Sequence, residues 1–268
     1  MNFKKNFFKN YLIEAPIPLA LERSLECDIL SAKQFKRPIL DIGCGEGLFA
    51  YILFDEKIDV GIDPNSKELE RAKYYNTYKE LICCYGNNIP KPSKFYNTIF
   101  SNSVMEHIPE IEGVLKEVHR LMMDDGDFYI TVPTNYFDRY SVINQLLLKL
   151  GLRRQATSFR VFFNKFWHHY HYYTIEQWKD LFKKNGFEIS ETINYCRKAT
   201  AITNDFLVPW SWWSFICKRM LNRWYISKPT RFLQSRIYFF LLKGVIEKEK
   251  REETNNGGIV FFHLKKKK

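Results

Sequence analysis

The stretch Ile39-Leu40-Asp41-Ile42-Gly43-Cys44-Gly45-Glu46-Gly47 decides the fold expected of this 268-residue chain. Its first four residues form a short, mostly apolar run typical of a buried strand. The run ends in a Gly-x-Gly-x-Gly turn, whose glycines accept positive φ angles and let a ligand approach the main chain. Residues 48–53 then show helix-like periodicity. The order strand, glycine loop, helix predicts a site where backbone N–H groups meet a small ligand at a helix N-terminus.

A second strand ends in an acidic residue at an informative distance from the glycine loop. Residues 58–63 (IDVGID) read as a strand, and Asp63 lies 20 residues after Gly43. In a nucleotide-binding βαβ unit, an acid at this place accepts hydrogen bonds from both ribose hydroxyls. The glycine turn and the spaced acid together are more specific than either alone, and they predict a nucleoside-binding site.

The rest of the chain continues the alternation of strands and helices. It predicts a doubly wound α/β sheet, parallel where helices connect the strands. The further strands are expected at 81–85, 95–100, 128–133, 187–195 and 258–264. Helices are expected at 66–75 with Ser66 as N-cap, 111–123, 142–150, and 175–184 with Thr174 as N-cap and Gly186 as C-cap. Apart from its one short helix, the aromatic segment 134–173 is expected to be irregular.

Three parts of the chain are expected to have different roles. Residues 1–36 contain an amphipathic helix over 19–35, which could form a lid over the glycine-loop pocket or simply pack, with the charges of Glu22, Arg23 and Glu26 in solvent. Residues 37–196 plus 257–265 form the ligand-binding domain. Residues 197–256 form a helical insert before the last strand, in which aromatic and basic residues alternate. This mixture suits a membrane interface or acceptor binding, and equally a subdomain that packs its aromatic side chains on the sheet.

The net charge and the cysteines indicate which partners and which cellular compartment suit the protein. The formal net charge is +11 and the pI is near 9.2, which favours nucleic acid, a membrane surface or an anionic substrate without choosing among them. The six cysteines form no CxxC pair, which is typical of reduced thiols in a cytoplasmic protein. No run approaches the roughly 20 apolar residues of a spanning helix. We therefore expect a cytoplasmic protein, peripheral at the inner face of the membrane if the insert binds lipid.

Together these motifs resemble class I S-adenosylmethionine-dependent methyltransferases of the small-molecule type, similar to UbiE and UbiG. The resemblance covers roughly residues 37–196 and the last strand. It rests on the glycine loop, on Gly61-Ile62-Asp63, on 95–108 around the fourth strand, on 121–126, and on Tyr172-Tyr173-Thr174 with Trp178 and Gly186-Phe187. The usual glycine pair before the fifth strand is reduced to Asp125-Gly126. The resemblance implies a Rossmann-like seven-stranded sheet whose last strand is antiparallel and lies between the fifth and sixth.

The resemblance also implies the cofactor, S-adenosylmethionine, and residues that hold it. The loop residues Gly43, Cys44, Gly45 and Gly47 would wrap the methionine end, with Asp41 as a partner for its ammonium group. Asp63 would hold the ribose hydroxyls. Where the family often has an acid facing the adenine, this chain has Asn87-Asn88, and either amide could pair with the adenine edge. Asn102, at the end of the fourth strand, would lie near the methionine moiety.

Methyl transfer to oxygen benefits from a base, and two places in the chain offer one. His107 follows the fourth strand, where the pocket should open, although it could instead brace the loop. His171 and Tyr170 belong to an aromatic cluster, 167–173, that could line an acceptor pocket or form a packing loop. No metal site is expected, because His168, His169 and His171 have no nearby carboxylate or cysteine in the sequence.

The function expected from the sequence is methyl transfer to a small-molecule, glycan or lipid-linked acceptor at oxygen. Three alternatives remain open. Net charge suggests a nucleic-acid methyltransferase, although Ser101-Asn102-Ser103-Val104 is not the motif of amino-group methylating enzymes and no nucleic-acid module is appended. The glycine turn also fits an NAD-dependent oxidoreductase, although the last spacing of the dinucleotide fingerprint is missing. A non-catalytic binding protein could also keep the fold.

Overall fold

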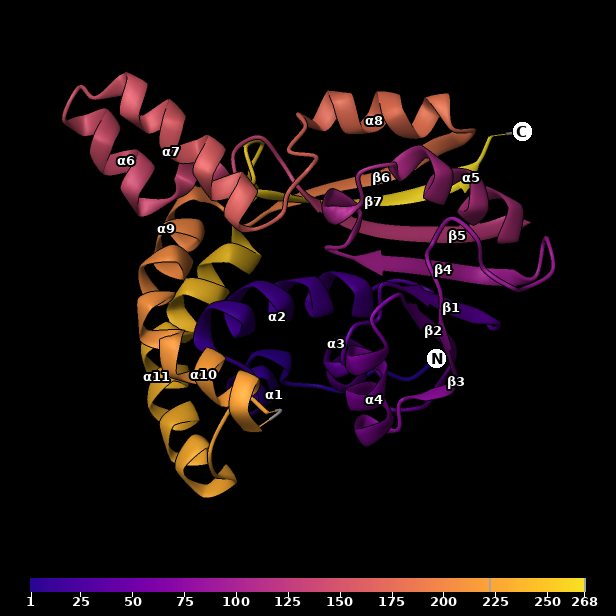
Figure 1. The fold of residues 1–268 in the computed structure, drawn as a ribbon, viewed down its shortest axis with the longest axis horizontal. Coiled ribbons are helices and arrows are strands. Elements are labelled where there is room, and N and C mark those ends of the chain that lie inside the picture. The colour runs from indigo at the N-terminus through magenta and orange to yellow at the C-terminus, as the bar shows by residue number, and fades with distance from the viewer. Residues whose placement is uncertain (222, 268) are drawn as a thin grey trace.

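The computed structural model describes residues 1–221 and 223–267, and a seven-stranded sheet forms their centre (Figure 1). The strand order is β3-β2-β1-β4-β5-β7-β6. The strands are β1 (Ile39–Ile42), β2 (Ile58–Asp63), β3 (Tyr78–Cys83), β4 (Tyr96–Asn102), β5 (Met122–Pro133), β6 (Phe187–Tyr195) and β7 (Ile259–Lys266). The expected Rossmann-like fold is confirmed.

Strand direction confirms the expected topology in detail. The pairs β1–β2, β2–β3, β1–β4 and β4–β5 are parallel, whereas β7 is antiparallel to both β5 and β6. The strand order reverses between β1 and β4, since chain connections leave in opposite directions from there. Ligands of such sheets bind beyond the carboxyl ends of the strands at this reversal, and the glycine loop after β1 lies there.

Helices cover both faces of the sheet (Figure 1). On one face lie α1 (Phe7–Glu14), α2 (Ile17–Ser31), α3 (Leu48–Leu53) and α4 (Ser66–Tyr75), and their buried residues form one core cluster. On the other lie α5 (Ile111–Leu121) and α8 (Ile175–Lys184) over a second cluster. Trp178 of α8 is fully buried and donates its Nε1–H to the carbonyl oxygen of Pro133 at 2.9 Å. This bond ties α8 to the end of β5.

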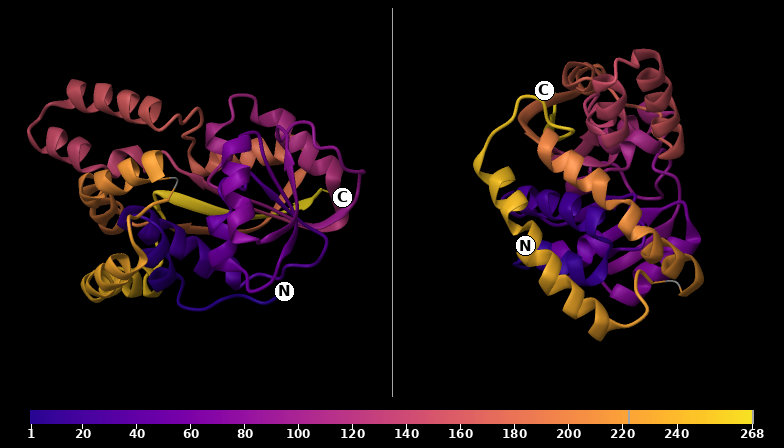
Figure 2. Two further views of the ribbon diagram at one scale, coloured as in Figure 1. Left: turned by 60° about the horizontal axis from the view of Figure 1, so that its bottom comes forward. Right: turned by 90° about the vertical axis from the view of Figure 1, so that its left-hand side faces the viewer.

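The remaining helices gather at one end of the molecule (Figures 1 and 2). They are α6 (Val142–Lys149), α7 (Arg153–Phe166), α9 (Lys198–Leu207), α10 (Trp212–Leu221) and α11 (Lys228–Arg251). Helices α6 and α7 form a projecting hairpin, while α11 packs on α1 and α9 packs on α2. The insert thus rests on the N-terminal helices. Within the described residues, no helix has both the length and the apolar character needed to cross a bilayer.

Several local expectations are wrong. The segment 134–173 was expected to be irregular beyond one helix, yet it also contains α7. The segment before β1 has a second helix, α1. The N-cap of α4 is Asn65, whose side chain accepts a hydrogen bond from the Lys67 N–H at 3.1 Å, instead of Ser66. The Thr174 capping box of α8 is confirmed, whereas the C-cap of α8 is Asn185 and Gly186 follows it at φ +85°.

Candidate functional site

The glycine loop has the backbone geometry that the sequence predicts. Gly43, Gly45 and Gly47 have φ angles of 76°, 51° and 77°. The N–H groups of Gly43 and Cys44 both donate to the carbonyl oxygen of Ile62 at 2.9 Å, which fixes the loop against β2. A Cβ at Gly43 would lie 2.5 Å from the methyl carbons of Val104, whereas one at Gly45 would meet no atom within 4 Å. Gly45 therefore borders open space, as a loop that admits a ligand requires.

Asp63 joins the end of β2 to this loop. Its Oδ2 accepts a hydrogen bond from the Gly45 N–H at 3.0 Å, and its Oδ1 accepts one from the Asn65 N–H at 2.8 Å. Burial raises the pKa of the carboxyl group, and the two backbone N–H groups oppose that shift. Each carboxylate oxygen keeps lone-pair capacity for a hydroxyl donor.

A cavity of about 440 Å³ opens beside Asp63. Apolar side chains that could enclose a flat ring, including Ile62, Tyr85 and Ile108, line it together with Gly43, Asp63 and Asn87. Asn87 lines this cavity and Asn88 does not. The residues present therefore fit an adenosine group: a carboxylate for the ribose, an amide for the base edge and apolar walls for the ring.

Asp41, Cys44 and Asn102 lie just outside this cavity. Asp41 is 3% exposed, accepts a hydrogen bond from the Tyr78 hydroxyl at 2.7 Å, and has its pKa raised by burial to about 7. The Cys44 side chain is buried beneath the loop. Asn102 donates its amide to Glu26 at 2.6 Å and accepts a hydrogen bond from the Thr131 hydroxyl at 3.0 Å. These three residues thus support the loop and the end of β4.

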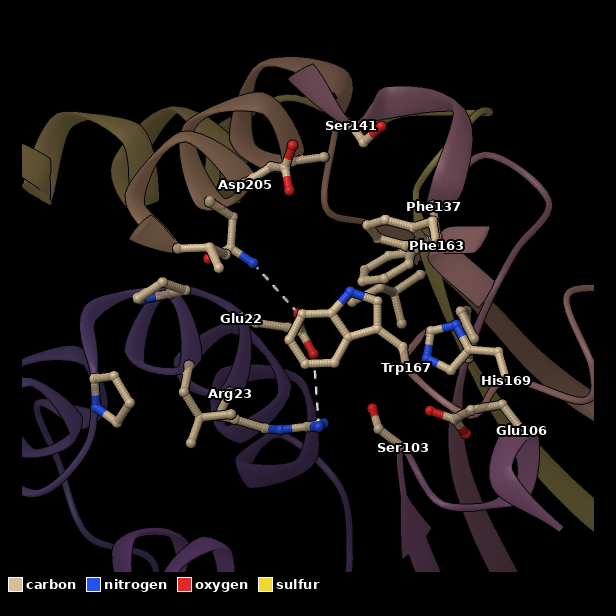
Figure 3. Close-up of a pocket in the computed structure, with 18 of the residues that line it drawn as sticks. Glu22, Arg23, Ser103, Glu106, Phe137, Ser141, Phe163, Trp167, His169 and Asp205 are labelled. Atoms are coloured by element: carbon tan, nitrogen blue, oxygen red, sulfur yellow. Dashed lines mark hydrogen bonds and ion pairs between the residues drawn. The ribbon is translucent and has the colours of Figure 1, made fainter. Parts of the chain in front are cut away.

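A second cavity, of about 300 Å³, lies at the junction of the N-terminal helices, the segment after β5 and the insert (Figure 3). Aromatic and aliphatic side chains form most of its wall, and Trp167 reaches toward its centre. Its lining includes Pro16, Leu19, Glu22, Arg23, Ser103, Glu106, His107, Phe137, Phe163, Trp167, His169, Asn204, Val208, Phe215 and Trp224. His107 lines both cavities, so this residue stands between the two spaces.

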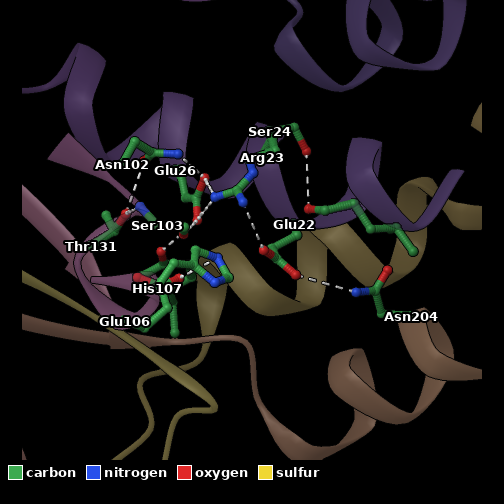
Figure 4. A network of polar contacts seen from close by, with 12 residues as sticks. Glu22, Arg23, Ser24, Glu26, Asn102, Ser103, Glu106, His107, Thr131 and Asn204 are labelled. Atoms are coloured by element: carbon green, nitrogen blue, oxygen red, sulfur yellow. Dashed lines mark hydrogen bonds and ion pairs between the residues drawn. The ribbon is translucent and has the colours of Figure 1, made fainter. Parts of the chain in front are cut away.

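A network of buried charges lies along one wall of this second cavity (Figure 4). Arg23 donates to both carboxylate oxygens of Glu26 at 2.9 and 2.8 Å, and its Nη2 lies 3.6 Å from Glu22 Oε1. Glu26 is fully buried and also accepts hydrogen bonds from Asn102, Ser103 and Tyr195. Burial raises the pKa of Glu22 to about 7. The expectation that these charges lie in solvent is wrong, because α2 turns them toward the sheet instead.

Three side chains that can bind a proton or a metal lie close together in the wall of the second cavity. Ligand-capable atoms of Glu106, His107 and His169 all lie within 4.8 Å of one another. Glu106 is 3% exposed, its Oε2 has no hydrogen-bond partner among the described residues, and burial raises its pKa to about 8. Burial lowers the pKa of His107, and it lowers that of His169 to about 4. Both imidazoles are therefore neutral near pH 7.

The residues that the sequence suggested for catalysis do not lie at one site. His107 lines both cavities, whereas His171 and Tyr170 line neither. Both ring nitrogens of His171 are engaged, Nδ1 with the Tyr173 hydroxyl and Nε2 with the carbonyl oxygen of Ile108, each at 2.9 Å. The Tyr170 side chain is 56% exposed. These contacts match the packing loop that the sequence left open as the alternative.

Sequence reasoning missed Glu106 and the functional position of Arg23 and Glu26. One signal was present, since Glu106 immediately precedes His107 after a predicted strand. No comparable signal marks α2, because its charges meet the end of β4 only through tertiary packing.

Comparison with known proteins agrees with this geometry. Residues 19–192, more than half of the chain, match a family model described as a methyltransferase domain. A ubiquinone biosynthesis O-methyltransferase from Pelagibacter ubique is 31% identical over 38% of this chain and 44% of that protein. A sterol 24-C-methyltransferase from Pneumocystis carinii is 32% identical over 37% of this chain and 29% of that protein. The chain thus spans less than half the length of these two relatives.

A solved structure shows the same fold over nearly the whole chain. An S-adenosylmethionine-dependent methyltransferase from Thermotoga maritima superposes with a TM-score of 0.56 at 15% identity, covering 94% of this chain and 92% of that one. The chain therefore belongs to the methyltransferase-domain family, and its fold is that of a known S-adenosylmethionine-dependent methyltransferase.

Proposed function

We propose that this enzyme methylates an oxygen atom of a small, largely apolar acceptor, either free or carried on a glycan or lipid. The observation that carries the proposal is that His107 lines both cavities. One cavity suits the cofactor, and the other has a mostly apolar lining next to a buried carboxyl group. Relatives named for ubiquinone and sterol methylation support an apolar acceptor, and the first of them is an O-methyltransferase.

The cofactor-binding roles follow from the placement of each residue. Asp63 holds the ribose hydroxyls and Asn87 pairs with the adenine edge, while the loop from Gly43 to Gly47 wraps the methionine end. Asp41 and Asn102 act beneath this end, Asp41 as a partner for the ammonium group. When bound, S-adenosylmethionine supplies a methyl group on a sulfonium whose thioether is a good, neutral leaving group. The protein then contributes mainly alignment of the acceptor oxygen with that methyl.

His107 is the base that takes the proton of the acceptor hydroxyl. Its Nδ1 lies 3.2 Å from the carbonyl oxygen of His168, so an Nδ1–H donated there leaves the Nε2 lone pair free. Because burial lowers its pKa, the imidazole is neutral and ready to accept a proton at pH 7. Glu106 Oε1 lies 3.8 Å from Nε2, and the imidazolium formed in the reaction would draw this carboxyl group into its ionised form.

The other parts of the chain support the acceptor cavity. Residues 1–36 serve as its lid, since Pro16, Leu19 and Arg23 form part of its wall. Residues 197–256 contribute acceptor-binding side chains, among them Val208 and Phe215. His171 acts as a positioning residue, because its bond to the Ile108 carbonyl oxygen holds the loop that carries His107.

Transfer of a labelled methyl group tests this proposal. The wild-type protein and its variants are incubated with methyl-labelled cofactor and with small-molecule and lipid extracts, and labelled products are separated. We expect transfer by the wild type and about a 100-fold lower turnover for His107→Gln, with S-adenosylhomocysteine affinity within a few-fold by calorimetry. The rate should fall as the pH drops through the lowered pKa of His107, and this acid limb should disappear in the variant.

The comparator variant is His171→Gln, which should lower the rate less and keep the acid limb. Full turnover in His107→Gln would contradict the assigned base. Label in nitrogen or carbon of the product would contradict oxygen as the acceptor atom.

A further inference from the structure

Two long segments of the chain contain no acidic residue. The protein has 30 Asp and Glu residues, yet none lies in 139–175 or in 206–246. In the fold these segments become the α6–α7 hairpin, helix α10 and most of α11, which lie at the same end of the molecule (Figures 1 and 2). Folding therefore places two segments at the same end of the molecule, and the charged residues of both are all Lys or Arg.

The same end exposes an unusual amount of apolar surface. Trp210, Trp212 and Trp213 are 73%, 71% and 61% exposed, and Phe162 and Phe166 are each 61% exposed. We name this surface the aromatic face; it comprises the exposed residues Ile143, Leu146, Leu150, Val161, Phe162, Phe166, Phe206, Trp210, Trp212, Trp213 and Met220. Contacts from α6 to α9, and from α9 through the 3-10 helix at 209–211 to α10, link the helices that carry these residues. A large exposed apolar surface of this kind indicates a binding partner.

Unneutralised basic side chains surround the aromatic face. Exposed ones include Lys149, Arg153, Arg154, Lys165 and Arg219. None of these five forms an ion pair with an acidic residue in the part of the chain that the structure describes, unlike Lys218, which pairs with Glu46. The partner must therefore be apolar and also supply negative charge.

An anionic lipid bilayer meets both requirements. Tryptophan side chains favour the level of the lipid headgroups, while long basic side chains reach anionic headgroups from apolar surroundings. Each basic residue near such a surface contributes about 1 kcal/mol to binding. A second copy of this chain would present the same positive charge and be repelled. Nucleic acid would supply the charge but would leave aliphatic side chains such as Leu146 and Leu150 in water.

We propose that the aromatic face docks on an anionic bilayer and that the second cavity takes its acceptor from that bilayer. The same helices carry both surfaces: Phe163 of α7 and Phe215 of α10 line the cavity, while Phe162 and Trp212 beside them belong to the aromatic face. Docking therefore brings the cavity wall to the lipid surface. The statement about the acceptor rests on the proposed methyl transfer, whereas the docking stands without it.

Vesicle flotation tests the docking with point variants of the full chain. The wild type should float with vesicles of phosphatidylcholine and phosphatidylglycerol and not with phosphatidylcholine alone. An apolar variant (W210S, W212S and W213S) should lose at least tenfold in partitioning. A charge variant (R153Q, R154Q and K165Q) should lose about fivefold for each removed charge, from about 1 kcal/mol per basic residue, and added salt should weaken the wild type in the same way.

The matched control removes exposed aromatic residues elsewhere. Tyr74 is 77% exposed and Phe95 is 41% exposed, and neither belongs to the aromatic face. The variant Y74S with F95S should float like the wild type. Every variant must bind S-adenosylhomocysteine with wild-type affinity, which shows that it is folded.

The outcomes separate the docking from the enzymatic proposal. Three results would each overturn the docking. The first is that the wild type does not bind anionic vesicles, the second that it forms a dimer in solution that the apolar substitutions dissociate, and the third that it binds RNA more tightly than vesicles. Label found in water-soluble products alone would overturn the bilayer as the source of the acceptor. Vesicle binding without any methyl transfer would support the docking while contradicting the proposed function.

Discussion

The two cavities of this enzyme are built in opposite ways. The cavity proposed for the cofactor uses chain segments that directly follow strands β1, β2, β3 and β4, and the positive φ angles of the glycine loop shape one side of it. The cavity proposed for the acceptor draws its wall from α2, α7, α9 and α10, and its lining includes the partly buried Glu22 and Arg23 and the buried Glu106. The first is determined by local turn chemistry, and the second by how distant helices pack. The comparison teaches that cofactor and acceptor recognition place different demands on the sequence.

The largest effect is expected where the acceptor cavity depends on a buried charge. Arg23→Met removes the partner of Glu26, whose side chain is fully buried. Leaving such a carboxylate without its ion pair typically costs about 3–5 kcal/mol in the free energy of unfolding. Urea unfolding followed by circular dichroism measures this loss.

The control for Arg23 is an exposed ion pair on α4. Lys73 and Glu70 pair at 2.6 Å with side chains 60% and 67% exposed, so Lys73→Met should change the unfolding free energy by less than about 0.5 kcal/mol. Equal effects of the two substitutions would mean that the wall of the acceptor cavity does not depend on its buried charges.

A smaller effect, on binding instead of folding, is expected in the cofactor cavity. Asp63→Asn weakens the acceptors for the ribose hydroxyls and for the Gly45 and Asn65 N–H groups. Hydrogen bonds to a charged group contribute about 1.5–3 kcal/mol each, so affinity for S-adenosylhomocysteine should fall about 100-fold by calorimetry.

Asp59 provides the matched control at the opposite end of β2. It accepts a hydrogen bond from the Ile39 N–H at 2.9 Å and lines neither cavity. Asp59→Asn should leave the affinity within about twofold. If Asp63→Asn left the affinity for S-adenosylhomocysteine unchanged, the Asp63 carboxylate would not be the group that holds the ribose.

The same contrast explains which features the sequence could predict. Gly43, Gly45 and Asp63 were predictable because their roles depend on backbone angles and on strand spacing within one βαβ unit. The antiparallel last strand between the fifth and sixth followed from the family resemblance. Glu26 was not predictable, because its partners Ser103 and Tyr195 lie 77 and 169 residues away in the chain. Helix α7 was missed because its exposed aromatic side chains, such as Phe162, disturb the apolar pattern that marks a packed helix.

Buried Glu106 should make the free energy of unfolding of the protein depend on pH. Its pKa is about 8 in the fold against 4.5 ordinarily, so the folded chain keeps a proton that the unfolded chain releases as the pH rises between these values. The protonated Glu106 carboxyl group therefore stabilises the fold fully below about pH 4.5. The free energy of unfolding that it contributes falls as the pH rises from there to about 8. The stability of Glu106→Gln relative to wild type should rise over this window by about 1.4 kcal/mol or more, the equivalent of one pKa unit.

Glu117→Gln is the control for this pH effect. The hydrogen bond from Arg120 lowers the pKa of Glu117. The ionised Glu117 carboxylate therefore contributes its full share of the free energy of unfolding above its ordinary pKa, and this share is lost only in more acidic solution. Its relative stability should therefore stay constant between about pH 5 and pH 8. A constant difference for Glu106→Gln as well would show that the carboxyl group is ionised in the fold.

The smallest effect separates two neighbouring asparagines after β3, Asn87 and Asn88. Asn87 lines that cavity, and Asn88 does not. One neutral hydrogen bond contributes about 0.5–1.5 kcal/mol, so Asn87→Ala should weaken S-adenosylhomocysteine binding by about threefold to tenfold. Asn88→Ala, its matched neighbour, should leave the affinity unchanged. A larger loss for Asn88→Ala would mean that the 86–88 turn rearranges around the adenine, and that even this locally built cavity is completed by its ligand.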